Sequence, residues 1–193
     1  MANFNEAYNI TLGHEGGYSN DPDDVGGETY KGVARSYYPD WAGWTTIDAA
    51  KSDTHFPNNL QGNDALDALI KQFYKENYWN LFWGDRIPNQ AVANELFDTG
   101  VNMGVGRAVK YLQKALNLLN RNQKNYPDVV EDGAFGNNTL LSLKIYLDID
   151  DESFLLKIMN ILQGMHYIDY MTKSPTQEKF ARGWLKRVSI NKN

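Results

Sequence analysis

Apolar residues recur every three or four positions along most of the chain, the spacing that places side chains on one face of an α-helix. Near the N-terminus such a stripe comprises Phe4, Ala7, Tyr8, Ile10 and Leu12. Further stripes predict helices over residues 63–79, 88–99, 102–117, 152–171 and from about 175 to 188. The chain is therefore expected to be mainly α.

The stripes also predict which residues begin the helices and which face the core. The polar residues suited to cap helix N-termini are Asn3 or Asn5, Asn63 or Asp64, and Asn137 or Asn138. The core face of helix 102–117 is expected to include Ala108, Val109, Leu112, Ala115, Leu116 and Leu119. That of helix 152–171 is expected to comprise Phe154, Leu155, Ile158, Leu162 and Met165. Residues 36–62 follow no periodic pattern and are expected to be irregular.

Glycines interrupt the pattern after the first helix. Gly16 and Gly17 are suited to end that helix, because glycine readily adopts the left-handed conformation of a helix C-cap. Pro22, Gly26 and Gly27 then punctuate a turn-rich segment that predicts a short irregular β-hairpin.

Composition and charge narrow the classes of protein. The 193 residues, 42% hydrophobic and 13% aromatic, suit one compact domain or two small ones. No apolar run is long enough to cross a bilayer, and the N-terminus lacks the features of a signal peptide. The net charge of −5, without a basic aromatic stripe, argues against nucleic-acid binding. With no cysteine and three scattered histidines, neither a catalytic zinc nor any other cofactor is implied.

The candidate chemistry lies in the segment that follows the first helix. Glu15 is expected at the last turn of that helix, where the helix dipole favours the protonated acid that a general acid must be. The loop can fold back so that Asp24 and Thr29 face Glu15, and such a carboxyl pair suits acid-catalysed glycoside cleavage. Asp21 and Asp23 are alternative second carboxylates. A purely structural Asp-rich turn is the plainer interpretation.

Two metal-site interpretations of this segment fail. An EF-hand loop starting at Asp21 would place Gly32 where a bidentate Glu is needed. A zinc-protease motif starting at His14 would place Tyr18 where the second His is needed.

The string EGGYSNDPDDVGGETYKGV, residues 15–33, resembles the signature of glycoside hydrolase family 108, N-acetylmuramidases with a lysozyme-like fold. Its spacing is similar to the Glu–Asp–Thr triad of phage-type lysozymes, except that Asp24 and Thr29 are one residue closer in sequence. The resemblance implies Glu15 as general acid, with Asp24 and Thr29 orienting the attacking water or stabilising positive charge. The residues expected to line the cleft are Tyr18, Asn20 and Tyr30.

A second resemblance covers residues 102–117 and 132–139, which look like the peptidoglycan-binding module that accompanies this family. The two resemblances suggest a catalytic region over residues 1–90 and a helical wall-binding region over residues 91–193, packed as one compact unit. The implied partner is the peptidoglycan glycan strand.

The sequence therefore predicts a lysozyme-like muramidase that cleaves the β-1,4 bond between N-acetylmuramic acid and N-acetylglucosamine. The alternatives are a lytic transglycosylase and a non-catalytic wall-binding or secretion-assisting protein. Because the wall lies outside the membrane and no export signal is recognised, we expect a holin-like pore or another export system to carry the enzyme to its substrate.

Overall fold

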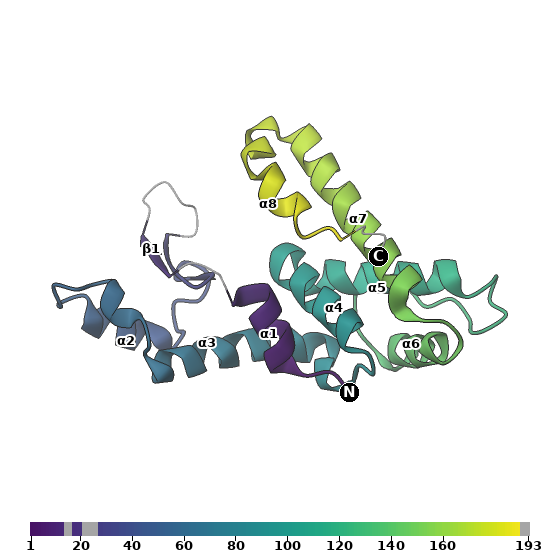
Figure 1. Ribbon diagram of the computed structural model, residues 1–193, viewed down its shortest axis with the longest axis horizontal. Coiled ribbons are helices and arrows are strands. Elements are labelled where there is room, and N and C mark those ends of the chain that lie inside the picture. The colour runs from purple at the N-terminus through teal and green to yellow at the C-terminus, as the bar shows by residue number, and fades with distance from the viewer. Residues whose placement is uncertain (14–16, 21–26, 190–193) are drawn as a thin grey trace. The chain divides into compact units, whose positions relative to one another are not determined.

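The computed structural model describes residues 1–13, 17–20 and 27–189. The described residues are mainly helical, with a small antiparallel sheet early in the chain (Figure 1). This confirms the predicted fold class, including the short hairpin after the first helix. Two compact units are present: residues 8–77 form one, and residues 1–7 with 78–193 form the other.

The elements follow one another in a simple order. The α-helices are α1 (Phe4–Leu12), α2 (Gly43–Ala50), α3 (Asp64–Asn77), α4 (Gln90–Met103), α5 (Val105–Leu119), α6 (Asn137–Ile149), α7 (Glu152–Lys173) and α8 (Ala181–Leu185). The strands are β1 (Tyr18–Asn20), β2 (Glu28–Tyr30) and β3 (Val33–Ala34). Short 3-10 helices are η1 (Asn58–Leu60), η2 (Trp79–Phe82), η3 (Gly84–Arg86) and η4 (Pro175–Phe180).

In the unit of residues 8–77, a tight turn fixes the sheet against α3. Strands β2 and β3 pair through Tyr30 and Val33, so only Lys31 and Gly32 connect them. Both connecting residues have positive φ, 43° and 82°, as a type I′ hairpin turn requires. The hydroxyl of Tyr74 on α3 donates to the Lys31 carbonyl at 2.9 Å, and Lys31 Nζ lies 2.6 Å from an Asp67 oxygen. These contacts hold the turn on the helix.

Helix α2 corrects the expectation that residues 36–62 are irregular. It spans only eight residues and buries Trp44 and Ile47, too few apolar positions to show a helical period. The Trp44 indole N–H also donates to the Tyr38 carbonyl at 2.8 Å, which secures the loop that precedes the helix.

Two of the expected caps are confirmed. The side chain of Asn3 accepts from the backbone N–H of Asn5 at 2.8 Å, and that of Asn63 accepts from Leu66 N–H at 3.0 Å. The expected start at Pro88 is two residues early, because Asn89 caps α4 by accepting from Val92 N–H. On α1 the predicted stripe is wrong at Ile10, which is 62% exposed.

In the other unit, α4, α5 and α7 pack against one another, and α6 packs on α5 (Figure 1). The predicted core face of α5 is confirmed at the five positions that are fully buried: Ala108, Val109, Leu112, Ala115 and Leu116. The cap expected at Asn137 or Asn138 is wrong, because Gly136 occupies the cap position of α6 and both asparagines lie inside the helix.

The predicted core face of α7 is wrong at two of its five positions. Leu155 is buried, but Phe154 and Met165 are 58% and 60% exposed. The helix instead buries a face that includes Asn160 and Gln163, two polar residues that bond to α4. Glu95 and Thr99 of α4 supply hydrogen-bond partners for these two polar residues, and apolar periodicity alone does not reveal such buried polar positions.

Candidate active site

The described part of the predicted site lies on the small sheet. Tyr18 and Asn20 are on β1, whereas Thr29 and Tyr30 are on β2. The antiparallel register pairs Tyr18 with Tyr30, Ser19 with Thr29, and Asn20 with Glu28. The structure therefore brings four of the six predicted site residues onto two adjacent strands.

Glu15 and Asp24 lie outside the described residues, as do Asp21 and Asp23. Helix α1 ends at Leu12, three positions before Glu15 in the sequence. The proximity of Glu15 and Asp24 to Thr29 stays a prediction.

Side chains on the two strands have different surroundings. The Thr29 hydroxyl donates to the Gly27 carbonyl at 3.2 Å, and Asn20 is exposed. The half-buried Tyr18 ring meets Phe56 edge to face, with ring centres 4.6 Å apart. Tyr30 is only 2% exposed and stacks on Trp41.

An ion-pair network braces the strand that carries Thr29. The Glu28 side chain, 12% exposed, lies 2.7 Å from both Arg35 and Lys51, and both cations also pair with Asp48 of α2. Burial opposes ionisation of Glu28, but hydrogen bonds from Lys51, Arg35 and Tyr18 outweigh it and lower its pKa. Glu28 is thus a structural carboxylate that fixes β2 to α2, a role that the sequence analysis missed.

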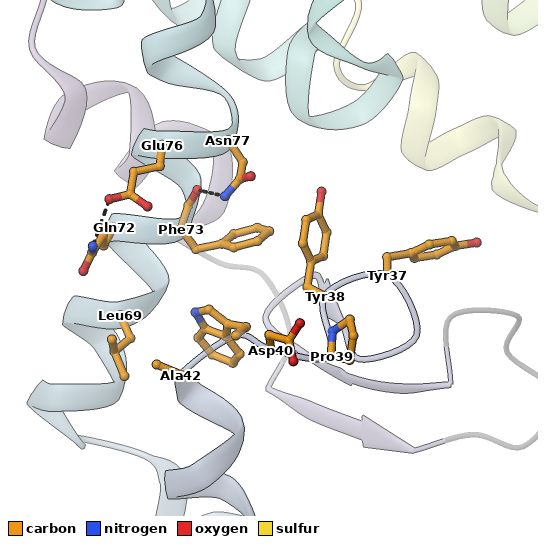
Figure 2. A pocket seen from close by; sticks show the side chains of 11 residues that line it. Tyr37, Tyr38, Pro39, Asp40, Ala42, Leu69, Gln72, Phe73, Glu76 and Asn77 are labelled. Atoms are coloured by element: carbon orange, nitrogen blue, oxygen red, sulfur yellow. Dashed lines mark hydrogen bonds between the residues drawn. The ribbon is translucent and has the colours of Figure 1, made fainter.

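A pocket of about 420 Å³ opens in the same unit, between the loop of residues 37–42 and the C-terminal half of α3 (Figure 2). Tyr37, Tyr38, Trp41 and Phe73 line it with aromatic rings. Figure 2 shows Phe73 and Asn77 directed from α3 toward Tyr38. The polar residues around it are Asp40, Gln72, Glu76 and Asn77.

The rings of this pocket are fixed by mutual packing. Tyr38 meets Phe73 edge to face at 4.6 Å, and Trp41 packs against Trp44 at 5.2 Å between ring centres. A Cβ at the buried Gly43 would overlap the Trp41 ring, so only glycine permits this approach. No role for this segment follows from the sequence motifs; its aromatic residues at positions 37, 38 and 41 are the available signal.

The turn before α6 is organised around one buried amide, Gln113 of α5. Its Nε2 donates to Asp132 at 3.0 Å and to the Ala134 carbonyl at 3.1 Å, while its Oε1 accepts from Gly133 N–H at 2.9 Å. Gly133 has a φ of 80°, and a Cβ there would overlap the Gly106 carbonyl oxygen. A shallow pocket of about 310 Å³ lies beside this turn.

Neither a metal site nor a membrane span is found in the described part of the chain. Its His, Asp and Glu side chains form no group of three that could hold a metal ion. None of its helices combines the length and the apolar character needed to span a bilayer.

Comparison with known proteins identifies both parts of the chain. The family model described as Glycosyl hydrolase 108 matches residues 8–104, just over half of the chain. The model described as Predicted Peptidoglycan domain matches residues 107–189.

Among similar solved structures is that of Brucella abortus SagA, at 26% identity and a TM-score of 0.59; the match covers 96% of this chain and 88% of that one. No curated protein matches the chain. The chain therefore belongs to glycosyl hydrolase family 108, and it is a glycoside hydrolase that acts on peptidoglycan.

Proposed function

We propose that the protein is an N-acetylmuramidase that cleaves the β-1,4 bond between N-acetylmuramic acid and N-acetylglucosamine, with Glu15 as its general acid. Glu15 protonates the glycosidic oxygen as the bond breaks and the sugar acquires oxocarbenium character. Asp24, with Thr29, orients the attacking water or stabilises the positive charge. The observation that carries the proposal is the family match over residues 8–104, which spans all three residues.

The described strands support this assignment of roles. The backbones of Asn20 and Glu28 are paired, so the two strand ends that flank residues 21–27 in the sequence are held together beside Thr29. The ion pairs of Glu28 with Arg35 and Lys51 fix that point against α2. A fixed hairpin base suits a site in which a loop carboxylate must meet a proton donor within a narrow range of distances.

We further propose that residues 1–90 form the region that hydrolyses the glycan strand and that residues 91–193 form the region that binds the wall. The matched peptidoglycan domain, which begins at residue 107, supports the binding role. Wall pull-down by the full chain, compared with a variant changed only at the turn of residues 132–139, tests this role without relying on turnover.

A wall-clearing assay tests the catalytic residue. Glu15→Gln should lower the initial rate on purified peptidoglycan by about 100-fold or more, since it removes the donated proton. Glu6→Gln, the same change at an exposed position on α1, is the matched control and should keep the rate. Equal rates for both variants would refute the role of Glu15.

Single Asp→Asn substitutions at positions 21, 23 and 24 identify the second carboxylate. We expect Asp24→Asn to lose the most activity, with the neighbouring substitutions close to the wild-type rate. A larger loss at position 21 or 23 would move the assignment to that residue.

A further inference from the structure

We propose that the pocket between the loop of residues 37–42 and α3 binds an uncharged N-acetylated sugar, and that it selects N-acetylglucosamine over N-acetylmuramic acid. The inference deepens the proposed function, since it names the sugar that one part of the catalytic unit recognises. It is carried by three features of the described residues: fixed aromatic walls, polar groups beside them, and the sign of the charge.

The aromatic walls provide faces for a pyranose ring. Tyr37 is 67% exposed, so its ring is open to a ligand. Tyr38 and Trp41 are held by the packing of Phe73 and Trp44 behind them. Side chains that are already fixed lose little entropy when a ligand stacks on them, which favours binding. The volume of about 420 Å³ lies within the range of small-molecule sites.

Polar groups stand where a sugar's hydroxyls and acetamido group need partners. Asp40 is exposed on the loop and offers a carboxylate to sugar hydroxyls. Asn77 Nδ2 donates to the Phe73 carbonyl at 2.9 Å, so the Asn77 oxygen is the atom that can accept from the N–H of an acetamido group. Gln72 donates to Glu76 at 2.9 Å, and both side chains project from α3 on the side away from Tyr37 and Tyr38 (Figure 2).

Charge then distinguishes the two sugars when each is offered as a free monosaccharide. The described residues that line the pocket include two carboxylates, Asp40 and Glu76, and no Lys, Arg or His. Free N-acetylmuramic acid carries a lactyl carboxylate, which two negative side chains repel, whereas N-acetylglucosamine is neutral. The same repulsion disfavours nucleic acids and other polyanions. A small organic cation would satisfy both the rings and the carboxylates, and the experiment must distinguish it.

Proton NMR of the full chain, with the indole signal of Trp41 assigned through its contact with Tyr30, provides the test. N-acetylglucosamine should shift the Trp41 signal in a saturable way, and N-acetylmuramic acid should bind at least 5-fold more weakly. Tyr37→Ala should weaken N-acetylglucosamine binding by about 3- to 10-fold, the range that one lost aromatic contact provides. Asp40→Asn should narrow the difference between the sugars.

The variants are chosen so that folding does not confuse the result. Tyr37 and Asp40 are exposed, so their replacement leaves the core of the unit intact. Phe154→Ala, at a residue 58% exposed on α7, removes an aromatic ring of similar exposure from the other unit and should not change binding.

Several results would overturn the inference. These are no shift with either sugar, equal binding of both, or tetramethylammonium binding more tightly than N-acetylglucosamine with an affinity that falls as salt is added. Failure of the proposed function can be distinguished from failure of this inference. Sugar binding without release of wall fragments would refute the muramidase activity and support the sugar-binding role of the pocket. Fragment release without sugar binding would support the muramidase activity and refute the sugar-binding role of the pocket.

Discussion

The substitution Glu95→Gln should make the protein less sensitive to alkaline pH. Glu95 lies on α4, partly buried against α7, and accepts hydrogen bonds from Thr99 at 3.1 Å and Asn160 at 2.9 Å. Burial raises the pKa of Glu95 from 4.5 to about 7; the two hydrogen bonds oppose this, and the nearby Asp98 adds to it. Asp98 is itself paired with Arg187 at 2.7 Å.

The sign of the effect follows from linkage. Since the folded state holds the Glu95 proton more tightly than the unfolded state, its contribution to stability is full below the unfolded pKa. That contribution is lost as pH rises through the folded pKa of about 7. At 1.36 kcal/mol per pKa unit, the free energy of unfolding falls by about 2.5 kcal/mol between pH 5 and pH 8 from this group alone. Glutamine is uncharged at both pH values, so the variant lacks this loss.

Urea unfolding at pH 5 and pH 8, followed by circular dichroism, measures the effect. The free energy of unfolding of Glu95→Gln minus that of the wild type should rise by about 2.5 kcal/mol between the two pH values. Glu178→Gln, the same change at an exposed residue of η4, should show no such rise. If the free energies of unfolding of Glu95→Gln and the wild type differ by the same amount at both pH values, Glu95 is not a buried carboxyl with a raised pKa.

Three further substitutions test local features of the fold. Asn3→Ala removes the α1 cap and should lower the free energy of unfolding by about 1 kcal/mol in urea titrations, whereas an unchanged midpoint would mean that the cap contributes nothing. Gly133→Ala meets both a positive φ and an overlap with a carbonyl oxygen, so it should cost more than about 1 kcal/mol in the same titration; a neutral result would contradict the turn geometry. Arg35→Gln removes a cation beside Glu28 and should raise the pKa of that carboxyl in an NMR titration, and a fall would show that Arg35 does not stabilise the ionised form.

Sequence reasoning succeeded where one physical signal acted alone. Helix α5 packs its apolar stripe into an apolar core, so its buried positions follow directly from their spacing. Asn63 precedes an amphipathic helix and caps it, as its side chain favours. The mainly helical fold and the early hairpin follow from the same signals.

Sequence reasoning failed where tertiary contacts determine which residues are buried and which residue caps a helix. Helix α7 buries Asn160 and Gln163 because Glu95 and Thr99 on α4 are their hydrogen-bond partners, and no local pattern shows that pairing. Gly136, rather than an asparagine, occupies the N-cap position of α6, with no side-chain hydrogen bond at the cap.

The candidate site likewise has features that local sequence predicts and features that depend on tertiary contacts. Thr29 and Tyr18 lie on the strands of a hairpin that nearby turn residues in the sequence predict. The pocket at residues 37–42 combines a loop with a helix some 30 positions later, and the Glu28 network links β2 to α2. Such groupings depend on long-range packing.

Mass spectrometry of peptidoglycan digested by the wild type and by Glu15→Gln determines whether the protein is a muramidase and whether Glu15 is its general acid. We expect fragments that end in reducing N-acetylmuramic acid from the wild type, and none from the variant. Anhydro ends from the wild type would instead identify a lytic transglycosylase. Reducing N-acetylmuramic acid ends released equally by both proteins would contradict the role of Glu15, and sedimentation with the wall without any released fragment would contradict the muramidase.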